Sequence, residues 1–546
     1  MLTKTTALAV AAFFCIPLVA RSSSPTYGAD NQRTGWYPDQ PGLAPSTVAD
    51  PSFGELFQAE VTGQVYAQPL VWNGVVVIVT ETNDIYGLDA ETGEARWTRR
   101  VETPWNSADL GCPDLAPTVG ITGTPVIDPA TSAAYFFAKT YQSGSSGPGK
   151  YVAHAVSVAT GEELPGFPVT VEGSPTNDPG ISFDATYQLQ RPGLLLLDGV
   201  VYAGFGSHCM FGPYHGYVAG VSTSGQLRTL WSTTPHDLFG GSIWQSGGGI
   251  VSDGPARLFV VTGNRGGPAA PSPGENPPPN LGQSVIRLEV QADGSLLPRS
   301  FFTPYDAPDL DDGDLDFGSG GPVALPSDPF SLPGHPALVL AGGKAGALFL
   351  LDRENLGGCR QGAGGTDAAL LRTEPYGGVW AKPSVWPGDG GYVWLPTASP
   401  EASSVGSAGR LLAFRFEVDG GGQPALSLVA ASRDDFWFGS GSPVITSNGT
   451  VAGTALVWVV RSPDGTGLGA ELRAYDAVPS GGFPVLRFSA PVSQATKFAA
   501  PGVGDGRIYV GARDGHVYGF GAPRNLWQRG SESGQQKRRR VLEVRP

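Results

Sequence analysis

Eight copies of one short pattern constrain the fold of this chain more than any other feature. Each copy opens with small residues or proline and leads into an apolar run, as in TGTPVID at 122–128 and FGSGGPVAL at 317–325. A second apolar run follows at a matching distance in each copy. Such repetition indicates one supersecondary unit stacked on copies of itself. The opening segments start at Ala67, Thr122, Gln190, Trp244, Phe317, Trp380, Phe438 and Lys497.

The cleanest copy, residues 65–101, indicates what the unit is. It contains three β-type runs and a fourth short run through Trp97, separated by turn signals such as Asn73-Gly74. Four antiparallel strands in one unit form a propeller blade. We therefore predict an all-β chain folded as a single β-propeller of eight four-stranded antiparallel blades, with seven blades as the alternative. A lone strand at 53–61 precedes the first unit, and we expect it to close the ring by pairing into the last blade.

The ends of the chain differ from this repeating middle. Residues 1–21 carry Lys4 and an apolar run at 7–20, which indicates a secretory signal peptide. That run is shorter than the about 20 residues of a membrane span. We predict an extended leader at 22–51, the propeller at 52–522 and a polar, basic, disordered tail at 523–546. The mature protein is expected to be secreted, or periplasmic in a Gram-negative host.

The charge of the chain excludes one class of partner, and its cysteine content indicates the compartment in which the protein works. The net charge of −14 argues against nucleic acid, which would require a basic surface. No other apolar run reaches the length of a membrane span. Three cysteines follow the predicted signal peptide, and export favours disulfides. We expect Cys112 to pair with Cys209, because both lie in loop-like segments of neighbouring units, and Cys359 to remain free.

Polar and aromatic residues at the opening segments form the first candidate site. The innermost strand of a blade starts there, so these side chains are expected at the mouth of the central channel. Cations match carboxylates and flat rings stack, so the set suits a planar anion. The alternative is that polar channel residues only satisfy buried strand ends and trapped water. The candidates are Gln68, Arg191, Trp244, Gln245, Trp380, Lys382 and Lys497.

Two further segments carry metal-ligating residue types. The run DAPDLDDGDLD at 306–316 offers closely spaced carboxylates on a glycine-containing loop, as Ca²⁺ requires, although the full EF-hand pattern is absent. A solvated acidic loop is the alternative. Residues 207–215 combine imidazole, thiol and thioether groups, which suit copper or zinc, or pack on aromatic rings with Cys209 oxidised. The calcium candidates are Asp309, Asp311, Asp312, Asp314 and Asp316.

The ending D-A-x-T-G-x-x-x-W at 89–97 resembles the repeat of quinoprotein alcohol dehydrogenase-like propellers. The segments at 120–131, 205–216, 243–249 and 317–323 are similar to secreted, pyrroloquinoline-quinone-binding-like repeat proteins. The resemblance implies the propeller fold over 52–522. It also implies pyrroloquinoline quinone (PQQ) and Ca²⁺ as cofactors of the enzymatic members. Those members carry a vicinal Cys-Cys disulfide, and their cytochrome-fused relatives carry C-x-x-C-H; this sequence has neither.

Two functions remain open from the sequence. The first is an exported binding or interaction protein that takes a small molecule, glycan or protein at its channel mouth and long loops. The alternative is a PQQ-dependent oxidoreductase acting on an alcohol or a sugar. The conspicuous Asp89, Thr92, Gly93 and Trp97 are expected to serve turns and packing between blades rather than chemistry.

Overall fold

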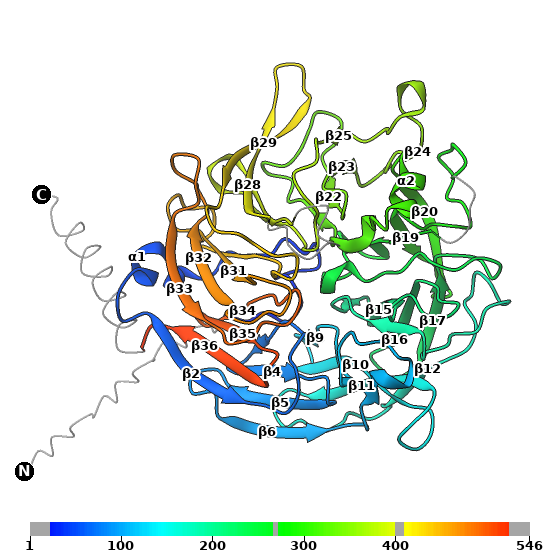
Figure 1. The fold of residues 1–546 in the computed structure, drawn as a ribbon, viewed down its shortest axis with the longest axis horizontal. Helices are drawn as coiled ribbons and strands as arrows, with labels where there is room; N and C mark the ends of the chain where they lie inside the picture. Colours follow the sequence, from blue (N-terminus) through cyan, green and yellow to red (C-terminus); the bar gives the residue numbers. More distant parts are fainter. Residues whose placement is uncertain (1–21, 266–270, 399–408, 524–546) are drawn as a thin grey trace, which may run out of the picture.

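Eight mainly antiparallel sheets surround a central axis in the computed structural model of the chain (Figure 1). The structure describes residues 22–265, 271–398 and 409–523. The predicted signal peptide and all but the first residue of the predicted tail lie outside these ranges. The prediction of an eight-bladed, all-β propeller is confirmed, and the seven-bladed alternative is wrong. Among the described residues, helices are too short or too polar to cross a membrane.

Strands within each blade follow one another from the centre outward, mostly in chain order. Blades 1 and 2 contain β3 (Leu70–Trp72), β4 (Val75–Val79), β5 (Asp84–Asp89), β6 (Ala95–Arg100), β9 (Val126–Asp128), β10 (Ala133–Tyr141), β11 (Gly149–Ser157) and β12 (Val169–Val171). Blades 3 and 4 contain β13 (Gln188–Gln190), β14 (Leu195–Leu197), β15 (Val200–Ser207), β16 (Tyr217–Ser222), β17 (Leu227–Ser232), β18 (Arg257–Val261), β19 (Val285–Val290), β20 (Leu296–Thr303) and β24 (Gly358–Cys359).

The other half of the ring repeats this arrangement. Blades 5 and 6 contain β21 (Val323–Ala324), β22 (Leu338–Gly342), β23 (Leu348–Asp352), β25 (Leu371–Arg372), β26 (Ser384–Trp386), β27 (Tyr392–Pro396), β28 (Leu411–Val418) and β29 (Pro424–Ala431). Blades 7 and 8 contain β1 (Trp36–Tyr37), β30 (Val444–Thr446), β31 (Leu456–Arg461), β32 (Glu471–Asp476), β33 (Leu486–Pro491), β34 (Gly502–Gly504), β35 (Arg507–Gly511), β36 (His516–Gly521) and β2 (Gly54–Glu60). The pairs β1–β30 and β20–β24 are parallel.

The ring closes between its two ends, as expected. Strand β2, from the beginning of the chain, pairs antiparallel with β36 and forms the outer edge of blade 8. The short helix α1 (Pro45–Val48) precedes β2 and lies beside β33 at the outer side of blade 7 (Figure 1). Because the last blade contains strands from both ends of the chain, the backbone hydrogen bonds between β2 and β36 hold the ring shut.

Packing between neighbouring blades uses the residues that mark the end of the first repeat. The indole Nε1 of Trp97 donates to the carbonyl of Val158 in blade 2 at 2.9 Å. A Cβ at Gly161 would lie 2.5 Å from the Trp97 ring, so glycine allows the two blades to approach. Within its turn, the Asp89 carboxylate accepts from the backbone of Glu91 at 2.8 Å. These contacts agree with the structural roles expected for the motif.

The N-terminal segment 22–40 differs from the expected extended leader, because most of it is buried or half-buried inside the ring. It exchanges hydrogen bonds with all eight blades in turn. The pairs, in blade order, are Ser24–Val71, Pro25–Ile127, Asn31–Leu196, Asn31–Ser252, Gln32–Ala324, Thr34–Val385, Gly35–Ile445 and Ser22–Asp505. A segment with few apolar residues folds here because its backbone groups find partners on the innermost strands. It therefore acts as a plug of the channel, and we use that name for residues 22–40.

Arg33 holds the centre of the plug. Its side chain is fully buried, and burial lowers its pKa to about 10. The guanidinium donates to the carbonyl of Leu194, between β13 and β14 of blade 3, at 2.8 Å and to that of Ile250, before β18 of blade 4, at 2.8 Å. It also donates to Tyr27 O and to the Thr26 hydroxyl within the plug. The buried charge of Arg33 is tolerated because nearly every N–H of its guanidinium has a hydrogen-bond acceptor.

Candidate functional site

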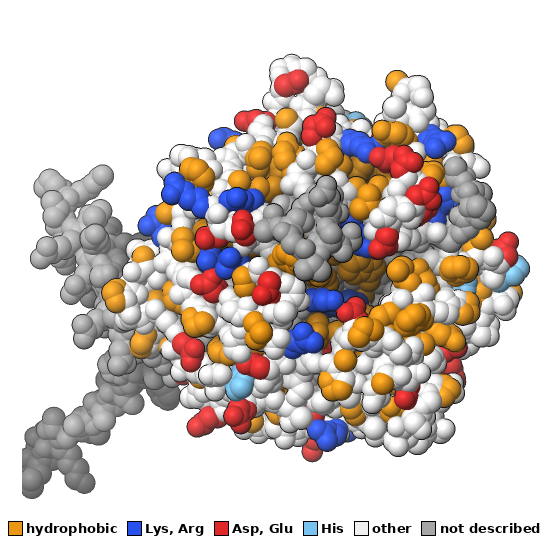
Figure 2. Space-filling view, in the orientation of Figure 1, with side chains coloured by type: hydrophobic (Ala, Val, Ile, Leu, Met, Phe, Trp, Pro, Cys, Tyr) orange, Lys and Arg blue, Asp and Glu red, His pale blue; other side chains and the backbone are white. Residues whose placement is uncertain are grey.

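A cavity of about 440 Å³ opens at the centre of one face of the ring. Figure 2 shows a hollow there, with hydrophobic, basic and acidic side chains on its walls. The volume lies within the range of about 300–1,000 Å³ that is usual for small-molecule sites. Its charged lining residues are Asp114, Arg191, Asp314, Asp316, Lys344 and Lys497, and its aromatic ones are Tyr66, Tyr214, Trp244, Trp380, Phe438 and Phe498.

Four aromatic rings follow one another along the wall. Phe498 lies 6.3 Å from both Trp244 and Phe438, and Phe438 lies 5.7 Å from Trp380. We call these four residues the aromatic arc. Each belongs to an opening segment of a different blade, so the repeat places one ring from each of these four blades at the mouth. Such a wall offers flat apolar faces for stacking.

Arg191 lies between the arc and the neighbouring Tyr66. Its guanidinium carbon is 5.5 Å from the Tyr66 ring and 5.8 Å from the Phe498 ring, and Nη2 donates to the carbonyl of Lys497 at 3.1 Å. Burial lowers the pKa of Arg191, which nevertheless stays charged. Gly247 makes room for it, because a Cβ there would collide with Nη1, and the residue has a left-handed φ of 83°.

Lys344 and Asp316 form a second polar group beside Trp244. The Lys344 ammonium lies 2.7 Å from the Asp316 carboxylate and 5.9 Å from the centroid of the Trp244 ring. Burial disfavours the charged ammonium, but the carboxylates of Asp316 and Asp314 raise the pKa of Lys344 above its ordinary value. Asp316 also accepts from the backbone N–H of Asn264 at 2.8 Å. The carboxylate is thus fixed in a mostly buried position at the cavity wall.

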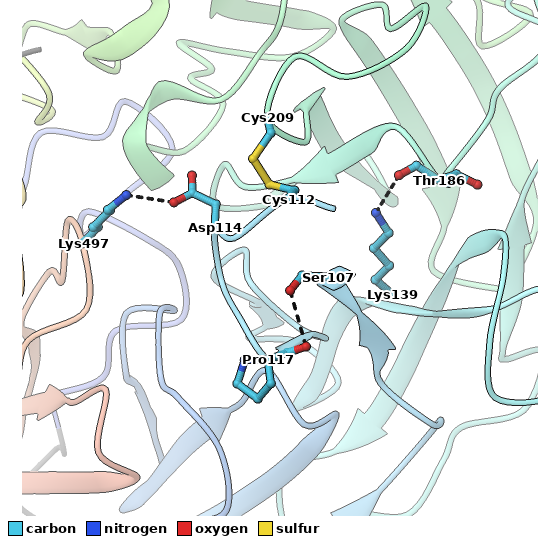
Figure 3. Close-up of a disulfide and its surroundings, with 8 residues drawn as sticks. All are labelled: Ser107, Cys112, Asp114, Pro117, Lys139, Thr186, Cys209 and Lys497. Carbon is cyan, nitrogen blue, oxygen red and sulfur yellow. Dashed lines mark hydrogen bonds and ion pairs between the residues drawn. A yellow bond between two sulfur atoms is a disulfide. The ribbon is translucent and has the colours of Figure 1, made fainter. Parts of the chain in front are cut away.

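A hairpin from the loop between blades 1 and 2 reaches over the cavity. Strands β7 (Trp105–Asn106) and β8 (Thr118–Val119) pair antiparallel, and the residues between them carry Asp114 into the lining. We call residues 105–119 the strap. Asp114 pairs with Lys497 of the last opening segment at 2.9 Å (Figure 3). Both side chains are about half exposed, so this ion pair is weak and open to competition.

The strap is also held by a disulfide. Cys112 and Cys209 are joined, with their Cα atoms 5.9 Å apart, as the sequence led us to expect (Figure 3). Cys359 is free and buried. Next to the disulfide, the imidazole of His208 is almost fully buried, and burial followed by the charge of Lys139 lowers its pKa to about 3. His208 packs edge-on against Trp105, with ring centroids 5.7 Å apart.

The seven channel candidates divide into two groups. Arg191, Trp244, Trp380 and Lys497 line the cavity. Gln68, Gln245 and Lys382 are buried away from it. Gln68 accepts from the plug residue Gly28 at 2.9 Å, Gln245 accepts from Val261 at 3.0 Å, and the Lys382 ammonium donates to the carbonyl of Pro383. These three side chains therefore form hydrogen bonds with buried backbone groups. The alternative interpretation supposed this role for the whole set.

The calcium candidates do not converge on one point. Asp309 and Asp312 are exposed on the helix α2 (Ala307–Asp312). Asp311 accepts from the backbone of Arg265 at 2.8 Å, Asp314 accepts from the Asn264 amide at 2.7 Å, and Asp316 pairs with Lys344. In residues 22–265, 271–398 and 409–523, ligating atoms of three His, Cys, Asp or Glu residues come together only at Cys112, His208 and Cys209.

Several lining residues were missed by sequence reasoning. Phe438 and Phe498 occupy the same part of the repeat as Trp244 and Trp380, so alignment of the opening segments could have found them. Lys344 lies in the short turn between β22 and β23 of blade 5, and Asp114 comes from the strap outside the repeat. Neither carried a comparable signal. Where these two side chains lie depends on contacts between blades, and the local sequence pattern does not encode such contacts.

Comparison with known proteins supports the fold and leaves the activity open. Residues 49–164 match the family described as outer membrane protein assembly factor BamB. A segment of 53 residues is 38% identical to the assembly factor BamB of Burkholderia pseudomallei, and it covers 10% of this chain and only 14% of that relative.

Solved structures with the same fold include two alcohol-oxidising enzymes by name, a quinohemoprotein alcohol dehydrogenase and a methanol dehydrogenase. The quinohemoprotein alcohol dehydrogenase of Comamonas testosteroni superposes with a TM-score of 0.62 at 18% identity, over 92% of this chain and 81% of that one. A europium-containing methanol dehydrogenase superposes with a TM-score of 0.57 at 13% identity, over 90% and 89% of the two chains. Together these matches confirm the resemblance to PQQ-type propellers. At such identities they establish the fold alone.

Proposed function

We propose that this PQQ-type β-propeller is an exported binding protein that takes a flat small molecule bearing carboxylates into its central cavity. The observation that carries the proposal is the aromatic arc, which places four rings from four blades on one wall beside Arg191. A concave site with apolar walls and a few convergent polar groups is the usual form of a small-molecule site. A macromolecular partner would need no such depth.

The charges of the lining limit the ligand. Three cations and three carboxylates line the cavity, so its formal charge sums to zero. Lys344 is committed to Asp316, whereas Lys497 is only loosely held by Asp114. Arg191 donates to a backbone carbonyl and has N–H groups left for a ligand. A ligand carboxylate would therefore bind Arg191 and displace Asp114 from Lys497, while the rings cover its flat faces.

PQQ meets these requirements in shape and in part in charge. It is a planar tricarboxylate, so the arc suits its rings, and Arg191 and Lys497 suit two of its carboxylates. When bound, such a quinone accepts two electrons from a substrate. The described carboxylates do not converge as a calcium site. We therefore use PQQ as the first probe of the cavity without assigning a metal.

A second candidate function, oxidation of an alcohol or sugar with the quinone, is favoured by one observation. The Asp316 carboxylate lies at the cavity wall beside Trp244, held by Lys344 and by the Asn264 backbone. A fixed carboxylate beside a bound quinone could take the hydroxyl proton of a substrate. The dehydrogenases of the same fold supply the analogy, and analogy of fold does not carry activity.

Export is part of the proposal. The disulfide between Cys112 and Cys209 supports an oxidising compartment, because such bonds rarely persist in the cytosol. We propose that the protein works in the periplasm or outside the cell after removal of residues 1–21.

Thermal unfolding with PQQ, with and without Ca²⁺, tests the binding function, and reduction of an artificial dye across alcohols and aldoses tests the oxidoreductase. We expect a rise in Tm that is lost in Trp244→Ala and kept in Trp72→Ala, a tryptophan outside the cavity. A rise in Tm with no dye reduction supports the binding protein, and dye reduction that requires Asp316 supports the enzyme. Absence of both effects would contradict the proposal.

A further inference from the structure

The cluster beneath the strap contains three ligating groups that the proposed function does not use. The Sγ atoms of Cys112 and Cys209 and a ring nitrogen of His208 all lie within 4.8 Å of one another. His208 is 1% exposed, and within the described residues neither ring nitrogen makes a hydrogen bond of good geometry, with only the Asp114 backbone as a weak partner. Burying two ring nitrogens that lack good hydrogen bonds is unfavourable unless another partner is available in some state of the protein.

We propose that, when the disulfide is reduced, Cys112, Cys209 and His208 bind one soft cation, Zn²⁺ or Cu⁺, at the edge of the central cavity. Two thiolates and an imidazole form a donor set that these ions prefer over Ca²⁺ or Mg²⁺. Three protein ligands leave a coordination position for a further ligand. Because Cys209 lines the cavity, that position is accessible from the cavity side.

Opening the disulfide should leave the ligands in place, because other contacts hold both segments. On the strap, β7 pairs with β8, the Trp105 indole donates to Gly147 O at 2.9 Å, and Gln64 donates to Ala116 O at 2.7 Å. On the other side, the backbone N–H of His208 donates to Tyr187 O at 2.9 Å. The site is therefore preorganised by hydrogen bonds that do not depend on the sulfur–sulfur bond.

Reduction of the Cys112–Cys209 disulfide requires a reductant, and a dithiol can supply the electrons and protons. The reductant gives two electrons and two protons to the Cys112–Cys209 bond and leaves as its own cyclic disulfide. Attack is expected at Cys209, because Cys112 is 2% exposed and Cys209 faces the cavity. Binding of the cation then releases the two thiol protons to solvent. The metal replaces the disulfide as the link between the strap and blade 3.

The test compares the full-length chain in its two redox states, with Co²⁺ as the spectroscopic substitute for Zn²⁺. The chain is reduced with dithiothreitol under argon, freed of reductant by gel filtration and titrated. We expect about one equivalent of Co²⁺ per reduced chain, with a thiolate-to-cobalt charge-transfer band in the near ultraviolet. The oxidised chain should show no such band. Equal uptake by the two states, or no uptake by the reduced chain, would overturn the proposal.

Variants separate this site from other donors. His208→Gln should weaken Co²⁺ binding at least about tenfold, since even residues behind metal ligands commonly contribute that much. His236→Gln, at an exposed histidine bonded to Asp178, should change nothing. Cys359→Ala removes the free thiol of the described part of the chain, Cys15→Ala removes the cysteine of the predicted signal peptide, and both variants should keep the band. Loss of the band in folded Cys359→Ala, or unchanged affinity in His208→Gln, would contradict the assignment.

If His208→Gln does not fold, the Co²⁺ titration is repeated with Cys209→Ser. Loss of the charge-transfer band in that variant supports the site, and persistence of the band overturns it.

Discussion

The ammonium group of Lys344 lies 2.7 Å from the carboxylate of Asp316 at the wall of the central cavity. The side chains are 14% and 12% exposed, so water screens the pair only in part. This pair occupies the side of the cavity that holds Trp244, and it separates the lining into a committed cation and two available ones, Arg191 and Lys497. The account of ligand binding depends on that division.

Removing one member of this pair should lower the free energy of unfolding more than removing both. Lys344→Met leaves the Asp316 carboxylate buried beside an apolar chain and should lower the free energy of unfolding by about 3 kcal/mol. The double variant Lys344→Met/Asp316→Asn should recover a large part of the loss, because no uncompensated charge remains. Urea denaturation of the four members of the cycle measures the coupling. Additive losses would show that the pair does not interact as the distance implies.

The plug should be essential to stability through Arg33. Arg33→Met removes donors to the carbonyls of Leu194 and Ile250 and leaves both buried without a partner, so we expect a loss of about 3 kcal/mol. Arg96→Met is the matched control, because Arg96 pairs with Asp89 at the exposed surface and should contribute less than about 1 kcal/mol. Denaturant midpoints compare the two. Similar small losses in both variants would show that the plug docks without Arg33.

The contribution of Glu81 to stability should fall as the pH rises from about 4.5 to about 7. His208, with its lowered pKa, acts in the opposite direction over part of this range, so the Glu81 effect is measured as the difference between the parent and Glu81→Gln. Burial raises the pKa of this carboxyl from 4.5 to about 7, against hydrogen bonds from Gly120 and Thr122 and the charge of Arg191. The folded state therefore keeps a proton that the unfolded chain releases in this window. The slope is at most about 1.4 kcal/mol per pH unit. Glu81→Gln keeps an acceptor and should shift the slope of Tm against pH in this range in the positive direction relative to the parent.

The buried ammonium of Lys139, which also acts on Glu81, titrates in a different pH window. Burial lowers the pKa of Lys139 from 10.5 to about 7, so its contribution makes stability rise with pH from about 7 to 10.5. The two windows meet only near pH 7, and this separates the two effects experimentally. A Glu81→Gln variant with the same slope as the parent below pH 7 would show that another group titrates there.

Gly247 offers a test of how Arg191 is held in place. Gly247→Ala forces a Cβ onto the guanidinium and also strains a left-handed backbone, so it should both destabilise the fold and weaken PQQ binding. Gly173→Ala is the control, because Gly173 is also left-handed, with φ 98°, but its added Cβ would meet nothing within 4 Å. The control should lose about 1 kcal/mol and keep its ligand affinity. Equal effects on affinity would remove Arg191 from the proposed site.

The repeat made the architecture predictable, whereas the plug could not be foreseen. Blade number, ring closure by β2 and the packing role of Trp97 all follow from local patterns, because each blade is built from contacts between sequence neighbours. The plug has no such pattern. Residues 22–40 fold by donating and accepting backbone hydrogen bonds around the whole ring, and any polar sequence without period would look the same.

The same difference between local pattern and long-range contact explains which residues of the cavity could be predicted. Trp244, Trp380, Arg191 and Lys497 could be placed at the mouth because their positions in the repeat put them there. Gln68 and Lys382 occupy similar positions but lie beside the plug, so their surroundings depend on a segment whose location was unknown. Asp114 reaches the cavity from the long loop between blades 1 and 2 and Lys344 from the short turn between β22 and β23, and only the folded ring brings them together.

Calorimetric titration of the full-length chain with PQQ tests the central claim most directly. The account predicts one saturable site per chain, with an affinity at least about tenfold lower in Trp244→Ala, since stacking and burial of a large ring contribute at least about 1.4 kcal/mol. Trp72→Ala should bind like the parent. No saturable heat in the parent, or the same affinity in Trp244→Ala as in the parent, would contradict a ligand held in the central cavity by the aromatic arc.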